Sequence, residues 1–177
     1  MNEDQILDYD FNSDDDDRIK MKLLSKNYFI ILFLLTFGMY GIWWQYKIWT
    51  FFKHRQNLDI MPVPRAIFSI FFIYSLFEKI LAFGKYNEVK KDYSSGGLFV
   101  LFLLLTYIIE RLPDPLPLLS FFAVFAYLPP HNIFNLALLN SEEFDAFYVD
   151  GFSQRQMILV GCGVIFWLLV LIGTFVE

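Results

Sequence analysis

The sequence predicts an all-α integral membrane protein with four to five short hydrophobic helices. Three observations predict this fold: an uncharged run at residues 156–176, four shorter apolar segments before it, and the composition. Of the 177 residues, 56% are hydrophobic and 20% are aromatic, whereas soluble domains are about 45–50% apolar. The length leaves no room for a sizeable soluble domain beside these segments.

The run at residues 156–176 is the strongest of these signals. Gln156 and Thr174 are its notable polar residues, and it contains no charged residue. A helix of about 20 residues, rising 1.5 Å per residue, reaches across a hydrocarbon core of about 30 Å. The run therefore predicts a helix that crosses a membrane.

Two apolar segments occupy the first half of the chain. The first, residues 28–42, continues into a tryptophan-rich stretch, residues 43–55. The second, residues 66–83, follows a linker in which Pro62 and Pro64 are expected to block helix formation. Gly84 is expected to end the second segment.

Two further segments lead to the terminal run. Residues 97–109 form the third segment, and residues 118–139 form the fourth. We expect the fourth helix to break at Pro129-Pro130-His131-Asn132, because proline lacks the backbone N–H that a helix interior uses. Residues 140–155 are a polar connection, and the acids after Ser141 resemble the first turn of a helix.

The acids and bases are unevenly distributed. Eight of the 19 acids lie in residues 1–17, which contain no base, so the rest of the chain holds 14 bases and 11 acids. Such a charged, weakly hydrophobic segment is predicted to be a disordered, cytoplasmic acidic tail. Residues 18–177 are predicted to form the polytopic membrane domain.

The bases favour one of three membrane topologies. Lys and Arg concentrate on the cytoplasmic side of membrane proteins. Nine of the 14 bases lie on that side if all five segments cross, and also if only the first is a re-entrant hairpin. If the first two segments both dip and return, 13 bases lie inside. The second segment is also short for a span, because only 12 apolar residues precede Glu78.

The first segment contains a glycine pair. Gly38 and Gly41 permit a backbone break or close helix packing. The run from Leu35 to Lys47 (LTFGMYGIWWQYK) resembles the Gly-Ile-Tyr-Gly-Ile-Tyr-Trp-x-Tyr-Lys signature of small bacterial membrane proteins that form a domain family of unknown function, and residues 64–77 resemble a second block. The resemblance covers residues 25–83 and implies a multi-pass protein of the bacterial inner membrane. It implies no activity or ligand.

Two sets of residues are candidates for function. Aromatic rings and bases at residues 43–55 suit the headgroup level of a bilayer. This interfacial belt comprises Trp43, Trp44, Tyr46, Lys47, Trp49, Lys53 and Arg55. A polar site inside the membrane is the second candidate, because ionisable groups there usually serve a function. In this interpretation Glu78 pairs with Arg65 or His131 as an ion or proton site. In the alternative interpretation the second segment is a hairpin, and Glu78 and Lys79 simply lie near the membrane interface. Backbone exposed at the expected break would add polar groups. The site comprises Arg65, Glu78, His131, Asn132 and Asn135.

The sequence nominates no catalytic residue, cofactor or metal site. His54 and His131 have no metal-ligand partners at suitable spacing, and no phosphate loop, nucleophile motif or carboxylate pair is present. No basic stripe indicates nucleic-acid binding. We therefore expect a non-catalytic scaffold or accessory subunit that contacts the lipid bilayer and a membrane-protein partner or a second copy of itself. A small oligomeric channel or carrier and a leaflet-wedging, lipid-organising protein are the alternatives.

Overall fold

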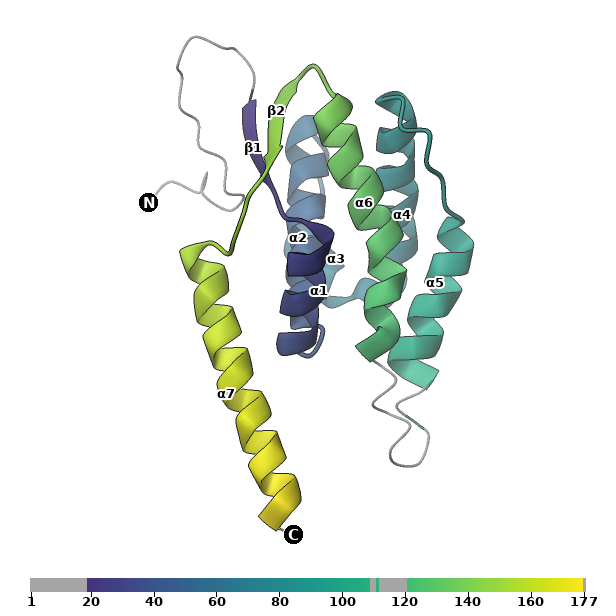
Figure 1. Cartoon of the computed structure of the whole chain (residues 1–177). Coiled ribbons are helices and arrows are strands. Elements are labelled where there is room, and N and C mark those ends of the chain that lie inside the picture. The colour runs from purple at the N-terminus through teal and green to yellow at the C-terminus, as the bar shows by residue number, and fades with distance from the viewer. Residues whose placement is uncertain (1–18, 109–110, 112–120, 177) are drawn as a thin grey trace.

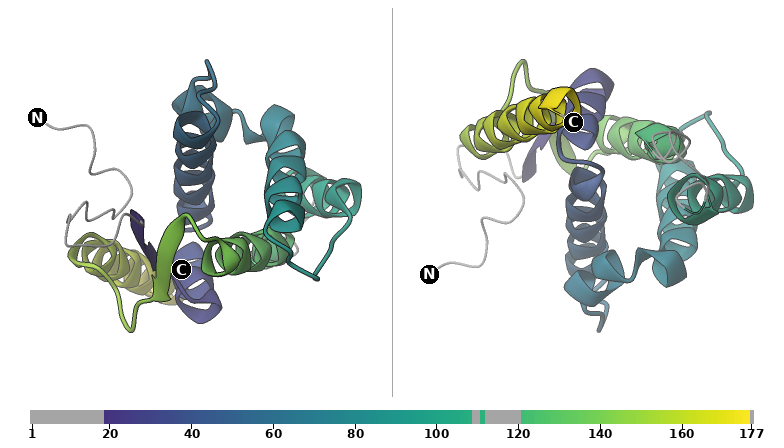
Figure 2. Two further views of the ribbon diagram at one scale, coloured as in Figure 1. Left: turned by 90° about the horizontal axis from the view of Figure 1, so that it is seen from above. Right: turned by 90° about the horizontal axis from the view of Figure 1, so that it is seen from below.

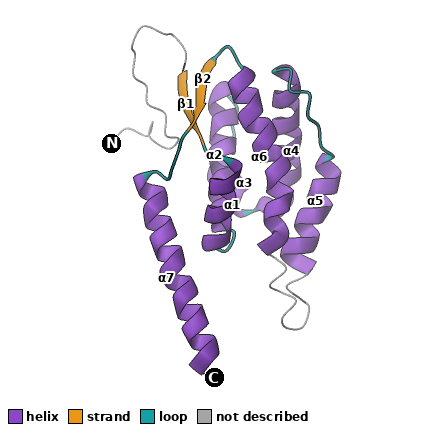
Figure 3. Cartoon of the chain, in the orientation of Figure 1, coloured by secondary structure: helices purple, strands orange, loops and turns teal. Residues whose placement is uncertain are grey.

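A computed structural model describes residues 19–108, 111 and 121–176, which form seven α-helices, a short π-helical turn and two strands (Figures 1 and 3). The prediction of a mainly helical chain is confirmed. The predicted acidic tail, residues 1–17, and the beginning of the fourth segment lie outside the described residues.

The first predicted segment is two helices rather than one. Helix α1 (Lys26–Leu35) ends at a turn, and α2 (Met39–Arg55) returns beside it (Figure 1). Gly38 has a φ of 81° in this turn, a conformation that costs glycine little. A Cβ atom at Gly41 would lie 2.8 Å from the Phe33 ring. The chain therefore reverses at Gly38, and Gly41 lets α2 approach α1.

Two expectations for the second segment were wrong. Pro62 begins the short helix α3 (Pro62–Ile67), because the first turn of a helix does not need the N–H that proline lacks. Gly84 does not end the next helix, α4 (Ser69–Tyr86). It is buried where α4 meets Ile133, and a Cβ atom there would lie 2.5 Å from Ile133 Cγ2.

The expected break in the fourth segment was also wrong. Helix α5 (Ser95–Leu103) runs into a π-helical turn (Leu104–Ile108), and α6 (Val124–Asn140) is continuous with Pro129 and Pro130 inside it. Each internal proline costs about 3 kcal/mol or more in an isolated helix. Here α6 packs against α1, α4, α5 and β2, and this burial outweighs the lost hydrogen bonds.

The polar connection forms a strand instead of a helix. Strand β2 (Phe144–Tyr148) pairs in parallel with β1 (Ile19–Leu23), and Ile19 lies opposite Phe144. Met21 and Leu23 alternate inward and are buried. A parallel pair joins segments more than 100 residues apart, so local sequence gives little sign of it. Helix α7 (Gln154–Val176) follows.

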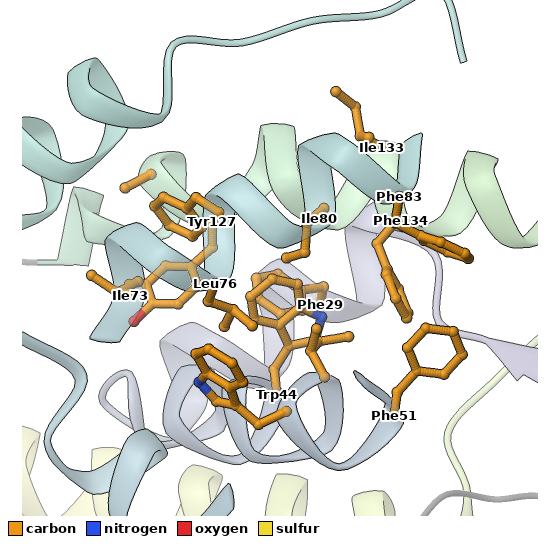
Figure 4. Packing of buried hydrophobic residues seen from close by; sticks show 14 of the residues in the cluster. Phe29, Trp44, Phe51, Ile73, Leu76, Ile80, Phe83, Tyr127, Ile133 and Phe134 are labelled. Atoms are coloured by element: carbon orange, nitrogen blue, oxygen red, sulfur yellow. The ribbon is translucent and has the colours of Figure 1, made fainter. Parts of the chain in front are cut away.

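Aromatic side chains fill the centre of the bundle. Seen along its axis, α1, α2, α4 and α6 surround the core, with α5 and α7 outside them (Figure 2). Phe29, Trp44 and Tyr127 meet within 6.4 Å of one another, and Phe51, Phe83 and Phe134 form a second group (Figure 4). Interdigitated rings of this kind bury large apolar areas.

The helices differ in how much of their own apolar surface is buried in the protein. Among the described residues, one helix, Phe121–Asn140, is long and apolar enough to cross a membrane, and 61% of its apolar window is buried in the protein. In α7 the apolar stretch found among the described residues, Gln156–Leu169, is shorter than such a span. Most of its large apolar side chains are exposed, including Ile158, Ile165 and Leu169.

Charges gather at one end of the bundle, here called the charged pole. Arg55 at the end of α2 binds Glu143, and Asn140 at the end of α6 donates to the carbonyl of Asn87. The opposite, apolar pole holds the Gly38 turn, where Phe37 contacts Phe121 and Trp167. The sequence has no Asp, Glu, Lys or Arg at residues 27–46, 66–77, 93–108, 121–141 and 156–176.

Candidate functional site

A cavity of about 300 Å³ lies between β1, α2, α6, residues 149–153 and the first turn of α7. It brings together segments from both ends of the chain. Its volume is at the lower end of the range for small-molecule sites. This cavity is the candidate site.

Helix α6 supplies two polar side chains to the cavity. His131 and Asn135 are one turn apart and so lie on the same face. The His131 side chain is 3% exposed, and its ring centre lies 4.6 Å from that of Phe29 and 6.2 Å from that of Trp44. Within the described part of the chain it makes no hydrogen bond. Asn135 Nδ2 donates to the Leu24 carbonyl at 3.0 Å and so fixes α6 to the segment that enters α1.

The first turn of α7 closes another side of the cavity. The Ser153 N–H donates to Gln156 Oε1 at 2.9 Å, and the Gln156 N–H donates to Ser153 Oγ at 3.4 Å. This reciprocal capping box fixes where α7 begins. Gln156 Nε2 also donates to the Tyr40 hydroxyl at 3.4 Å, which ties α7 to α2. The positive end of the α7 dipole therefore lies at the cavity.

Three charged residues line the cavity. Lys22 comes from β1, Lys47 from α2 and Asp150 from the segment before α7. The Lys47 ammonium lies 5.7 Å from the centre of the Trp43 ring. The positive end of the α7 dipole lies beside these charged side chains.

The predicted polar site is only partly assembled. His131 and Asn135 share the cavity, and Asn132 is half-buried beside them but does not line it. Glu78 is exposed on α4 and makes no ion pair with Arg65 or His131, so the expected pairing was wrong. The Arg65 guanidinium stacks instead on the rings of Trp49 and Phe72, at 4.7 and 5.0 Å. Arg65 and His131 are separated because they lie on different helices, each held by its own aromatic neighbours.

The interfacial belt divides between surface and core. Trp44 and Trp49 are buried, because α2 turns this face toward α4 and α6, so these two rings do not lie at a surface. Trp43 is exposed, and Tyr46, Lys47 and Lys53 are half-buried. Arg55 stacks on Phe83 and Tyr86 and binds Glu143 at 2.8 Å.

Tyr93 is an ionisable group whose surroundings shift its pKa. The Tyr93 hydroxyl donates to the Phe77 carbonyl at 2.6 Å. Burial raises the pKa of Tyr93 well above its ordinary value, and the carboxylates of Glu78 and Asp92 raise it further. Tyr93 therefore stays protonated and keeps this hydrogen bond at neutral pH.

Sequence reasoning missed several cavity residues: Lys22, Tyr40, Asp150, Ser153 and Gln156. A Ser-x-x-Gln pattern directly before an apolar run is a helix-start signal, and it marks Ser153 and Gln156. No local pattern marks Lys22 or Asp150, because the pairing of β1 with β2 brings them together.

The hydrogen-bonding side chains of the cavity suit recognition of a polar group.

The described residues hold no cluster of three or more His, Cys, Asp or Glu residues that could bind a metal ion. Comparisons with protein-family models, with curated proteins and with solved structures give no match.

Proposed function

We propose that this protein is a non-catalytic, polytopic membrane protein that serves as a scaffold or accessory subunit in a bacterial inner membrane. The separation of a charged pole from an apolar pole supports the proposal most strongly. The first half of α2 and of α4 and the whole of α6 carry no Asp, Glu, Lys or Arg, whereas Lys47 and the pair Glu78-Lys79 lie part-way along α2 and α4. A bilayer favours this arrangement, because charge is costly in its core. The resemblance of residues 35–47 to a bacterial membrane-protein family points the same way.

The proposed topology keeps the charged pole in the cytoplasm. The α1–α2 and α3–α4 hairpins enter the membrane from that side and return, while α5, α6 and α7 cross. Helix α1 has 10 residues, so it reaches only about 15 Å, half of the hydrocarbon core. Helix α7 has 23 residues, which reach about 34 Å. The many lysines at the charged pole agree with a cytoplasmic location.

Cysteine labelling from the outside of intact cells tests this topology. Cys162 is the only cysteine, so single cysteines are placed in a Cys162→Ser background at Gln56, Lys90 and Arg111. We expect a membrane-impermeant maleimide to label Arg111→Cys and to leave the other two unlabelled until the cells are opened. Labelling of Gln56→Cys in intact cells would contradict the hairpin topology, because a crossing first segment puts residue 56 outside.

Affinity purification tests the scaffold role. A scaffold retains a stoichiometric protein partner when it is extracted gently from its native membrane. We expect the partner to be lost when residues 1–17 are deleted, because their eight acids form the chain's most charged segment. Turnover or flux by the purified chain alone would contradict the proposal.

A carrier or channel is the second candidate function. The buried polar residues on α6 favour it, together with Gln45, which is fully buried and donates to the Tyr127 hydroxyl at 3.0 Å. Flux through reconstituted vesicles that falls with Asn135→Ala, and is unchanged by Glu78→Gln on the exposed face of α4, would support this function. A third candidate, a lipid-organising protein, is favoured by two hairpins in one leaflet, and a change of liposome shape on reconstitution tests it.

A further inference from the structure

We propose that Arg65 binds the phosphate of an anionic phospholipid from the cytoplasmic leaflet, and that the acyl chains of this lipid lie along α3 and the first turn of α4. The inference rests on the proposed function, because the proposed topology places α3 in that leaflet. Three observations carry it: a guanidinium without an anion, an apolar surface around it, and the order of the two relative to the charged pole.

Arg65 is a half-buried cation whose contacts among the described residues are aromatic. Its guanidinium lies 4.7 Å from the centre of the Trp49 ring and 5.0 Å from that of Phe72. Within the described part of the chain it makes no ion pair and no side-chain hydrogen bond, and none of its nitrogens is enclosed. Stacking uses the faces of the planar group, whereas its five N–H donors lie in the plane. These donors are therefore available to an anion that the described residues do not supply.

Arg55 shows what Arg65 lacks. The Arg55 guanidinium also lies over two aromatic rings, those of Phe83 and Tyr86, at 4.8 and 5.3 Å. Unlike Arg65, it binds a carboxylate, that of Glu143, at 2.8 Å. The two arginines thus have similar aromatic surroundings and differ in the anion. A phosphate can complete the site of Arg65, because it accepts two parallel N–H bonds from a guanidinium as a carboxylate does.

The surface around Arg65 is apolar. Arg65 is the only charged residue among residues 60–77. Five large apolar side chains of this stretch are more than half exposed: Met61, Val63, Ile67, Phe68 and Phe71. A soluble phosphate would leave these side chains in contact with water, whereas acyl chains would cover them. An amphiphile with a negative headgroup therefore matches both the charge and its surroundings.

The charge and the apolar surface follow the order of a lipid in the cytoplasmic leaflet. Helix α4 ends at the charged pole, and Lys79, which donates to Gln56, follows Phe72 by seven residues, or about 10 Å of helix. Phe68 and Phe71 precede Phe72 and so lie farther from the pole. Headgroups occupy about 5–7 Å on each side of the hydrocarbon core, and local thinning of the leaflet lets a phosphate reach an arginine a few Å deeper.

Calorimetric titration of the purified full chain in a non-ionic detergent tests the proposal. The probes are dihexanoyl-phosphatidylglycerol, the zwitterionic dihexanoyl-phosphatidylcholine, the uncharged dihexanoylglycerol and glycerol 3-phosphate, each corrected for its heat of addition to empty micelles. We expect saturable binding of the phosphatidylglycerol and at least tenfold weaker binding of the other three. The measurement needs no bilayer, so the lipid site can fail while cysteine labelling upholds the proposed topology.

The two stacked arginines supply a matched pair of variants. Arg65→Gln removes the guanidinium without an anion, and Arg55→Gln removes the one that binds Glu143. We expect Arg65→Gln to weaken phosphatidylglycerol binding at least tenfold, as for loss of one charge-assisted hydrogen bond, and Arg55→Gln to leave it within twofold. Arg65→Lys keeps the charge without the planar fork and should weaken binding less than Arg65→Gln. Circular dichroism checks that each variant folds, and Arg65→Lys serves as the test if Arg65→Gln does not.

Nitrogen NMR of arginine-labelled protein locates the bound lipid. The Nε signal of Arg65, assigned by its loss in Arg65→Lys, should shift on titration with phosphatidylglycerol, and that of Arg55 should stay in place. Three results would overturn the proposal: no saturable binding of phosphatidylglycerol, equal binding of any of the other three probes, or equal weakening by Arg65→Gln and Arg55→Gln. Loss of a co-purifying protein in Arg65→Gln, with lipid binding unchanged, would also overturn it and would assign Arg65 to a carboxylate of that protein.

Discussion

Helices α6 and α7 are both apolar and nearly free of charge, but their surroundings are opposite. Neither contains an Asp, Glu, Lys or Arg between its first turn and its last. Helix α6 is enclosed by α1, α4 and α5, and most of its residues are buried. Helix α7 packs against α1 and otherwise exposes apolar side chains, among them Met157, Ile158 and Ile165.

Apolar content alone therefore does not determine what covers a helix. The protein itself covers α6, whereas the described residues leave the apolar face of α7 exposed. Soluble proteins rarely leave a large contiguous apolar surface in contact with water. Substitutions in the buried bundle and on α7 should therefore have different effects on stability.

The largest expected difference concerns side-chain truncation. Phe77 is fully buried on α4, where its ring contacts Tyr127 of α6, and Ile165 on α7 is 61% exposed. Phe77→Ala should lower the free energy of unfolding by about 3–5 kcal/mol, and Ile165→Ala by less than about 0.5 kcal/mol. Denaturant unfolding in detergent, followed by circular dichroism, measures both. Equal losses would mean that α7 is covered as α6 is.

A charge in the middle of α7 gives the next largest effect. Ile165 lies near the centre of the 23-residue helix. An aspartate at the centre of a membrane helix costs about 2.5–3.5 kcal/mol of insertion, so Ile165→Asp should reduce insertion roughly a hundredfold. The activity of alkaline phosphatase fused after α7 reports insertion, because the enzyme is active only outside the cytoplasm. Ile165→Ala is the control, and unchanged activity in Ile165→Asp would place α7 outside the bilayer.

The contact between α4 and α6 sets the third prediction. Gly84 faces Ile133 so closely that an added methyl group overlaps it, whereas nothing lies within 4 Å of a Cβ atom at Gly96 on α5. Gly84→Ala should destabilise the bundle by about 1–3 kcal/mol. Gly96→Ala should leave the stability unchanged or raise it slightly. A neutral Gly84→Ala would show that α4 and α6 pack less closely than described here.

The sequence predicts the elements of this fold better than their boundaries. The length and apolar content of their segments identify α4, α5, α6 and α7 as helices. The errors arise where tertiary contacts override a local signal. Pro129 and Pro130 stay helical because α6 is buried on several sides. Gly84 lies inside α4, where its lack of a side chain lets Ile133 pack against the helix.

The candidate site is less predictable than the fold. His131 and Asn135 stand out in the sequence because they are polar residues in an apolar segment. Lys22 and Asp150 do not, since only the pairing of two distant strands brings them to the cavity. The expected pairing of Glu78 with Arg65 or His131 was wrong, because the sequence gives the charges of these residues but not their distances in the fold. The Arg65 guanidinium stacks instead on the rings of Trp49 and Phe72.

A pH titration of stability tests whether Tyr93 is buried. The Tyr93 pKa is raised by burial, so the folded state stays protonated at pH values at which an unfolded tyrosine, with a pKa of about 10, loses its proton. The hydrogen bond to Phe77 therefore contributes fully below about pH 10 and progressively less above it. We expect Tyr93→Phe to lose about 1 kcal/mol at neutral pH. Its stability should also fall less steeply above pH 10 than that of the wild type, and equal slopes would show that Tyr93 is not buried.

The smallest expected effect tests where α7 touches the bundle. A Cβ atom at Gly163 would lie 2.6 Å from the Leu35 carbonyl oxygen, whereas Gly161, two residues earlier, has nothing within 4 Å. Gly163→Ala should push α7 away from α1 and weaken the 3.4 Å hydrogen bond from Trp167 Nε1 to the Leu34 carbonyl. Because α7 adds little to the core, the free energy of unfolding should change by less than about 1 kcal/mol. The emission of Trp167 and its quenching by a membrane-soluble quencher should change in Gly163→Ala and stay as in the wild type in Gly161→Ala. If the bundle instead unfolds with the displaced helix, then α7 is part of the core that holds α6, and the contrast between the two helices fails.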